Sequence, residues 1–330
     1  MSRFWVLLLA SCILLSFTAP TAQTQEARTC KACGEQITGS YFETGRNYYH
    51  PHCFTCEYCT EPIEESYVVY KGKNYHRACF EKHVAIRCSV CNEIIKGEYF
   101  LDHWGNAYHK HHEEKIIRCD FCNRFIVGNL IKGMVRYPDG RHLCGKCSVS
   151  AVTELEIASS LMFDVAKQLG KFGLHVDPRE IELHLVGQDK LRELSSDRSG
   201  DTTGFTDYAI NKNLFGHVKY QSIKVYVLYG MPKVQMISTL AHELTHVWQF
   251  INGQLKQEQA LSEGSCNFAS YLVLRKIGGR EGEFIIENML NDKDPIYGEG
   301  FRRVKRYAEK NGLASWLKLL KMKDPSISTF

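Results

Sequence analysis

The stretch Leu240-Ala241-His242-Glu243-Leu244-Thr245-His246 holds two histidines and a glutamate in the pattern His-Glu-x-x-His. Four residues turn an α-helix through about 400°, so His242 and His246 project from one face about a turn apart. Two imidazoles placed in this way can share one zinc ion, with Glu243 beside the metal. The pattern is typical of metallopeptidases, although it also occurs by chance on ordinary helices.

The surrounding residues favour a buried helix. No Gly or Pro interrupts residues 234–251, and apolar side chains recur there at helical spacing. The predicted apolar stripe consists of Val234, Ile237, Leu240, Ala241, Leu244, Val247, Trp248 and Ile251.

A third metal ligand is expected on the next predicted helix, residues 257–277. Glu263 is the favoured ligand, and Glu258 is the alternative. Two imidazoles and one carboxylate leave a fourth tetrahedral position for water, which is the open arrangement of a catalytic zinc. Asn267, one turn after Glu263, is a candidate for orienting a ligand from outside the coordination sphere.

Twelve of the fourteen cysteines lie between residues 30 and 147. The spacing Cys-x2-Cys, His-x2-Cys-x2-Cys-x2-Cys, His-x2-Cys is that of a LIM domain, which holds two zinc sites in series. The predicted ligands of the first module are Cys30, Cys33, His50 and Cys53 for one zinc, and Cys56, Cys59, His76 and Cys79 for the other.

This pattern recurs roughly 58 residues further on, which predicts a tandem pair. In the second copy His109-x2-His112 replaces His50-x2-Cys53, with His111 as an alternative ligand. Six residues then precede the next Cys-x2-Cys, against two in the first copy, so we expect a looser joint. The predicted ligands of the second module are Cys88, Cys91, His109, His112, Cys119, Cys122, Cys144 and Cys147.

The N-terminus has the features of an export signal: a short basic start, an apolar run over residues 4–17, and small residues near Ala22. We expect a periplasmic or secreted protein without a stable membrane span, because the apolar run is short. A lipoprotein anchor at Cys12 is an alternative. Exported cysteines usually form disulfides, but disulfides need no histidines at fixed offsets, so zinc is favoured.

Length and composition fit this organisation. Modules of about 60 residues bury little apolar surface and depend on metal for stability. The predicted fold class is α+β, with two tandem LIM zinc-ribbon modules followed by a gluzincin-like α+β zinc peptidase domain. The predicted segments are a signal peptide (1–22), a first LIM module (28–84), a second LIM module (86–149) and a metallopeptidase domain (150–330).

The formal net charge of +4 is no sign of nucleic-acid binding, because Lys and Arg are scattered along the chain. The thiolates of the four LIM sites also outweigh their zinc ions, which brings the folded chain to about zero charge. No nucleic-acid partner is therefore expected.

Residues 222–229 are the strongest strand candidate, whereas residues 191–213 are polar and predict mainly loop. In zinc peptidases of this design, the strand before the His-Glu-x-x-His helix borders the cleft. We therefore expect residues 222–229 to offer a sheet edge to an extended substrate.

Several of these stretches resemble the plant organ-size-regulating LIM peptidases of the "DA-one" type, which look like ubiquitin-activated zinc peptidases. The resemblance rests on residues 225–232, Ala241-His242-Glu243, Glu263-Gly264-x-Cys266 and residues 294–302. It implies that His242, His246 and Glu263 bind zinc and that Glu243 is catalytic. The plant enzymes carry ubiquitin-interacting helices before the LIM region. Here only a short polar lead, 24–29, follows the signal, so we expect a bacterial-type relative without ubiquitin dependence.

The expected activity is zinc-dependent hydrolysis of peptide bonds. The metal would lower the pKa of its water to about 7 and polarise the scissile carbonyl, while Glu243 carries the proton to the leaving nitrogen. Candidates for stabilising the oxyanion are Tyr297, Tyr271 and His217, and Cys266 is read as a small buried residue.

The expected cofactor is zinc, about five ions per chain, four structural and one catalytic. The expected partners are a protein or peptide substrate and a protein that docks on the LIM modules. The alternative is a non-catalytic LIM scaffold with an inactive peptidase-like domain.

Overall fold

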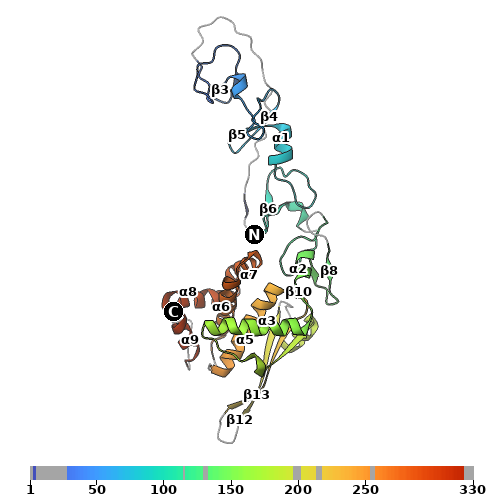
Figure 1. The fold of residues 1–330 in the computed structure, drawn as a ribbon, viewed down its shortest axis with the longest axis vertical. Helices are drawn as coiled ribbons and strands as arrows, with labels where there is room; N and C mark the ends of the chain where they lie inside the picture. Colours follow the sequence, from blue (N-terminus) through green and yellow to red (C-terminus); the bar gives the residue numbers. More distant parts are fainter. Residues whose placement is uncertain are drawn as a thin grey trace. The chain divides into compact units, whose positions relative to one another are not determined.

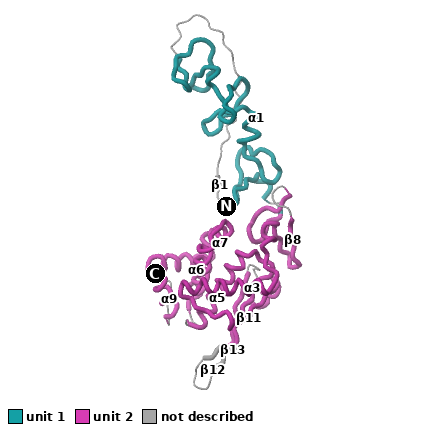
Figure 2. The backbone as a smooth tube through the Cα atoms, viewed as in Figure 1, with its two compact units in different colours: residues 1–116 teal, residues 117–330 magenta. Residues whose placement is uncertain are grey.

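The structure is a computed structural model. It describes residues 3–4, 28–113, 116–128, 133–195, 202–212, 218–252 and 257–322. The chain divides into two compact units, residues 1–116 and 117–330 (Figure 2). The predicted signal peptide, except for two residues, and Cys12 lie outside the described residues. Among the described helices, none is both long and apolar enough to cross a membrane.

Unit 1 is built from short antiparallel hairpins, each followed by a helical turn. Its small cores consist mainly of aromatic and cysteine side chains, such as Phe54 and Cys56. The strands are β1 (Arg3–Phe4), β2 (Phe42–Thr44), β3 (Asn47–Tyr49), β4 (Tyr67–Tyr70), β5 (Lys73–His76), β6 (Tyr99–Leu101) and β7 (Ala107–His109). The helical turns are η1 (Pro51–Cys53), α1 (Arg77–Cys79), η2 (Phe80–Val84) and η3 (Lys110–His112).

Unit 2 begins with one more such hairpin, β8 (Val135–Arg136) and β9 (His142–Leu143), followed by the short helix α2 (Gly145–Val149). The second half of the predicted second LIM module therefore lies in the same compact unit as the His-Glu-x-x-His helix. The boundary between the units, after residue 116, falls inside the six-residue segment between His112 and Cys119.

The rest of unit 2 is a mixed α/β domain, drawn from green to red in Figure 1. Its strands are β10 (Ala151–Val152), β11 (Ile181–Val186), β12 (Gly204–Lys212), β13 (Val218–Leu228) and β14 (Met231–Pro232). Its helices are α3 (Leu155–Lys171), η4 (Pro178–Glu180), α4 (Gln188–Ser195), α5 (Lys233–Asn252), α6 (Gln259–Ile277), α7 (Arg280–Asn291), α8 (Gly298–Asn311) and α9 (Leu313–Leu320).

The main sheet has the order β11-β13-β12, with β11 parallel and β12 antiparallel to β13. The predicted strand at residues 222–229 exists as β13, but its expected position at the sheet edge is wrong, because β13 is central. The edge strands of this sheet are β11 and β12, and β12 lies in a segment whose polar composition predicts mainly loop. Polar and small residues suit an edge strand, where one row of backbone groups remains unpaired.

The predicted helix around the His-Glu-x-x-His motif is confirmed as α5. Leu240, Leu244 and Trp248 are buried in the main core, as the apolar stripe predicted. The stripe fails at its end, since Ile251 is 42% exposed. The α5 helix packs against the sheet and against α3 and α6, so it is anchored along nearly its whole length.

Helices α6 and α8 cross at two glycines. A Cβ atom added at Gly264 would overlap the backbone of Gly300, and one added at Gly300 would overlap the backbone of Ala260. Because backbone cannot move aside as a flexible side chain can, both positions require glycine. Gly264 directly follows Glu263, so this crossing sets the position of the predicted third ligand.

We expect Gly264→Ala to destabilise the protein by about 1–3 kcal/mol, because its methyl group overpacks the crossing. Gly282→Ala is the matched control: this glycine lies in α7, and an added Cβ would be 3.7 Å from the Leu274 carbonyl oxygen, an ordinary contact. Alanine is the better helix former by about 1 kcal/mol, so the control should be neutral or stabilising. Thermal unfolding of both variants tests this. If Gly264→Ala were as stable as the wild type, α8 would not pack on α6 at Gly264.

Candidate metal centres

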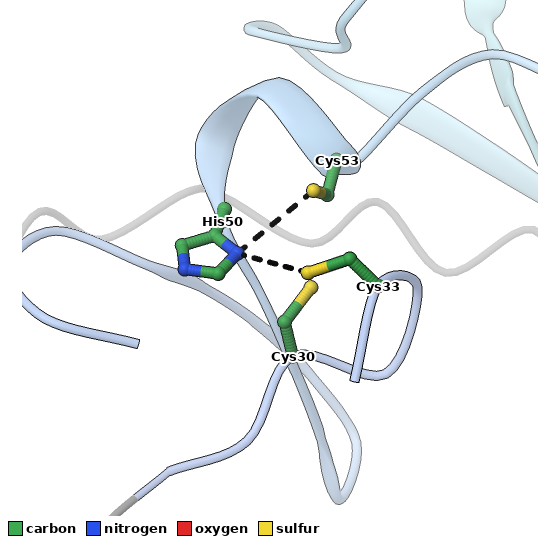
Figure 3. Close-up of side chains that lie close together, drawn as sticks. All are labelled: Cys30, Cys33, His50 and Cys53. Carbon is green, nitrogen blue, oxygen red and sulfur yellow. Dashed lines mark hydrogen bonds between the residues drawn. The ribbon is translucent and has the colours of Figure 1, made fainter. Parts of the chain in front are cut away.

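Four clusters of cysteine and histidine gather the ligands predicted for the two LIM modules, and in each one the candidate ligand atoms lie within 4.8 Å of one another. Figure 3 shows the first, in which His50 Nδ1 lies 3.5 Å from the sulfur of Cys33 and 3.8 Å from that of Cys53. Tetrahedral zinc with bonds of about 2.3 Å to sulfur and 2.0 Å to nitrogen sets these atoms roughly 3.5 Å apart. The spacing therefore suits zinc. The clusters are Cys30, Cys33, His50 and Cys53; Cys56, Cys59, His76 and Cys79; Cys88, Cys91, His109 and His112; and Cys119, Cys122, Cys144 and Cys147.

One backbone turn recurs in all four clusters. The residue after the first Cys-x2-Cys pair of each cluster has a positive φ, between 56° and 78°. Its N–H donates to the carbonyl of the first cysteine at 2.8–2.9 Å. The tandem repeat seen in the sequence is thus a fourfold repeat of one metal-binding turn. The four turn residues are Gly34, Thr60, Asn92 and Asn123.

The same turn stabilises a thiolate. Burial alone would raise the pKa of Cys30, but the backbone N–H groups of Cys33, His50 and Ala32 lower it to about 6. Equivalent N–H groups overcome burial at Cys56 and also lower its pKa to about 6. Because zinc binds the thiolate rather than the thiol, these positions are ready to coordinate it. None of the thirteen cysteines in the described residues forms a disulfide.

In the third cluster the geometry favours His112 over His111. His112 lies with Cys88, Cys91 and His109, whereas His111 is exposed. The His111 ring stacks on that of His109 and is tilted by 49° against that of His112. Within the described part of the chain, the buried Nε2 atom of His112 has no hydrogen-bond partner. A buried nitrogen without a partner is costly, and a metal ion would satisfy it.

A fifth cluster lies where α5 meets α6. The Oε2 atom of Glu263 is 3.1 Å from His242 Nε2 and 3.3 Å from His246 Nε2. Ligands bound about 2.0 Å from a tetrahedral zinc are roughly 3.3 Å apart, so these three atoms have the spacing of a zinc site. The alternative ligand, Glu258, is exposed at the start of α6 and does not join them.

Cys266 offers a rival ligand set with the two histidines. Its sulfur, however, is 3.4 Å from His246 Nδ1, which is the opposite ring nitrogen from the one that faces Glu263. Burial also raises the pKa of the Cys266 thiol to about 11, which keeps it protonated at neutral pH. For Glu263, burial alone would raise the pKa, but hydrogen bonds from His242 and His246 hold it well below its usual range. The carboxylate is therefore the better ligand.

The neighbours of the histidines orient them. Asn267 lies where the sequence predicted a supporting residue, with its Oδ1 3.0 Å from His242 Nδ1. Sequence reasoning missed Gln249, whose Oε1 is 3.1 Å from His246 Nδ1. Its position three residues after His246 on α5 could have identified it, since such residues share a helix face.

The fifth cluster lies in a cleft of about 930 Å³, lined also by β12 and by the segment before α8. Glu243 is 4% exposed, and its Oε2 accepts a hydrogen bond of 2.7 Å from the Thr206 hydroxyl. Thr206 had no signal in the sequence. Of the predicted oxyanion donors, Tyr297 lines the cleft, Tyr271 packs against the core, and His217 lies outside the described residues.

These features define a LIM-domain protein with a second, mixed α/β domain that carries a His-Glu-x-x-His motif and a candidate metal site. Comparison with known families agrees: residues 30–84 match the LIM domain, and residues 161–280 match the DA1-like domain of Protein DA1.

Three similar proteins are plant proteins of the DA1 group. The chain is 27% identical to Protein DA1-related 2 of Arabidopsis thaliana, over 87% of its own length and 67% of that protein. It is 25% identical to the LIM domain-containing protein HDR3 of Oryza sativa subsp. japonica, over 91% of its length and 74% of that protein. It is 25% identical to Protein DA1 of Arabidopsis thaliana, over 93% and 69% respectively. The predicted resemblance to the plant DA1 family is confirmed.

We expect Glu263→Ala to remove about one zinc ion per chain, because two histidines alone hold zinc weakly. Cys266→Ala should retain the full zinc content. Elemental analysis of the purified variants gives the measurement, with Glu258→Ala as a matched carboxylate control. Zinc lost from Cys266→Ala and kept in Glu263→Ala would make the thiol the ligand instead.

Proposed function

We propose that this protein is a zinc-dependent metallopeptidase with a gluzincin-like domain, in which His242, His246 and Glu263 hold the catalytic zinc. The observation that carries the proposal is the convergence of Glu263 Oε2 on the Nε2 atoms of both histidines, at 3.1 and 3.3 Å, beside Glu243 in an open cleft. When bound, zinc supplies an activated water and polarises a substrate carbonyl.

Glu243 is the proposed general base, which accepts the proton of the attacking water and returns it to the leaving nitrogen. Thr206 donates to one carboxylate oxygen at 2.7 Å and so restricts the side chain to one orientation. Gly204 approaches the other oxygen, because a Cβ atom there would lie 2.7 Å from Glu243 Oε1. The edge strand thus holds the base from one side.

The substrate that this cleft suits best is an extended peptide. Leu228 N–H donates to the Thr203 carbonyl, which directs the backbone of Thr203 toward β13. Successive residues of an antiparallel strand alternate in this respect, so Gly204 and Thr206 turn their N–H and C=O groups toward the free edge. An extended peptide that adds to this edge would lie next to the metal centre.

Tyr297 is the proposed donor to the oxyanion, because of the two candidates within the described residues it lines the cleft and Tyr271 does not. The LIM modules are proposed to dock a protein partner or substrate. We further propose that the chain is exported, on the evidence of its N-terminal sequence.

We expect Glu243→Gln to keep its zinc and to lose peptide cleavage by at least about a hundredfold, because the amide cannot accept the proton. A fluorescence-quenched peptide library measures cleavage, and elemental analysis measures zinc. Glu283→Gln, an exposed change on α7, is the matched control and should cleave normally. Undiminished cleavage by Glu243→Gln would remove Glu243 from the mechanism. A wild-type protein that cleaves nothing would favour the scaffold alternative.

We also expect about five zinc ions per chain, one for each of the five clusters. The thirteen cysteines of the described residues should all react as free thiols after denaturation. Elemental analysis and a thiol titration measure the two quantities. One zinc with few free thiols would mean that the cysteines of residues 30–147 pair as disulfides, which would leave the fifth cluster as the zinc site.

A further inference from the structure

Gln249 is a buried amide beside the proposed catalytic metal. It is 7% exposed and lies three residues after His246 on α5. Its amide nitrogen donates to the Ser262 carbonyl at 3.0 Å, and its Oε1 accepts from the Ser262 hydroxyl at 2.9 Å. Ser262 directly precedes Glu263. One side chain therefore touches both His246 and the turn of α6 that carries the carboxylate ligand.

This network fixes which way the amide points. The Ser262 carbonyl can only accept a hydrogen bond, so the NH2 group of Gln249 must face it. The amide oxygen then faces His246 Nδ1 at 3.1 Å. An oxygen acceptor at this place requires a proton on Nδ1, so that in the neutral imidazole, which is the form that binds a metal, Nε2 carries the lone pair.

Cys266 completes the surroundings of the amide oxygen, with its sulfur 3.6 Å away. The oxygen thus lies among three donors: the imidazole, the Ser262 hydroxyl and the thiol. At the other ligand, Asn267 occupies the same place against His242. Both metal-binding imidazoles are therefore supported by a neutral amide rather than by a carboxylate.

We propose that Gln249, held by Ser262, is a positioning residue that fixes the tautomer and ring orientation of His246 and ties α5 to the turn bearing Glu263. This rests on the metal site of the proposed function, and not on peptide cleavage. Supporting residues of this kind typically contribute 10- to 100-fold to metal affinity.

The test is the zinc affinity of the full chain, measured by competition with a chromophoric chelator in the absence of substrate. Gln249→Met keeps the length of the side chain and removes both hydrogen-bonding groups, so we expect zinc at the fifth cluster to bind about 10- to 100-fold more weakly. His246→Ala, which lacks a ligand, defines the signal of the other clusters. Gln259→Met, at an exposed position of α6, is the matched control and should bind zinc as the wild type does.

Two further variants separate positioning from packing. Gln249→Glu keeps an oxygen for His246 and loses the donor to Ser262, so its affinity should lie between those of wild type and Gln249→Met. Ser262→Ala leaves the amide in place and should weaken zinc binding only a few-fold. This milder variant provides a second test if Gln249→Met does not fold. Melting temperatures check the fold.

Wild-type affinity in a folded Gln249→Met variant would overturn the proposal, as would a Gln249→Glu variant no better than the methionine variant. Peptide cleavage is not needed for either reading. If the wild type binds zinc, follows this series and cleaves nothing, the peptidase fails and the role of Gln249 stands.

Discussion

The candidate metal site of unit 2 depends on how closely two buried helices approach each other. The α5 helix supplies both histidines and the α6 helix supplies the carboxylate. Three atoms on different backbone segments can share one zinc only if the helices hold a fixed separation and register. Two kinds of contact set them. The Gly264 crossing brings α8 against the turn bearing Glu263, and the Gln249 amide joins the two helices beside the ligands.

The fourth cysteine cluster belongs to this construction. Arg141, paired with Asp139, donates to the Tyr229 carbonyl, and the Asp139 carboxylate accepts from the backbone of Gln188. Because β10 also pairs with β14 just before Lys233, the chain that leaves this cluster holds the start of α5. A cluster of four cysteines with the spacing of a zinc site is thus built into the base of α5. It contributes to the shape of the mixed α/β domain, whatever the other three clusters bind.

The sequence predicted those parts of the site that follow from local spacing. His242 and His246 repeat with the helix, and the cysteine ligands repeat within short turns, so pattern alone located them. Glu263 could also be predicted, because α6 follows α5 directly in the chain. Thr206 and the edge position of β12 could not, since each depends on the pairing of β12 with β13 and on the packing of this hairpin against α5. Only part of the role of Gln249 follows from local spacing. Its partner His246 lies on the same helix, whereas its partner Ser262 lies on another.

The clusters differ in charge, and their surroundings follow that difference. Cys119, Cys122, Cys144 and Cys147 are all buried, and four thiolates around one zinc ion carry a net charge of about −2. In the other three clusters, the second residue after the Cys-x2-Cys pair is an exposed glutamate: Glu35, Glu61 and Glu93. In the all-cysteine cluster the same position is Arg124, which is 5% exposed and accepts the Cys119 N–H through its backbone oxygen. A buried charge needs a partner of opposite sign. The cation thus occurs in the one cluster that is built from four cysteines, where the repeat keeps its backbone turn and carries arginine in place of glutamate.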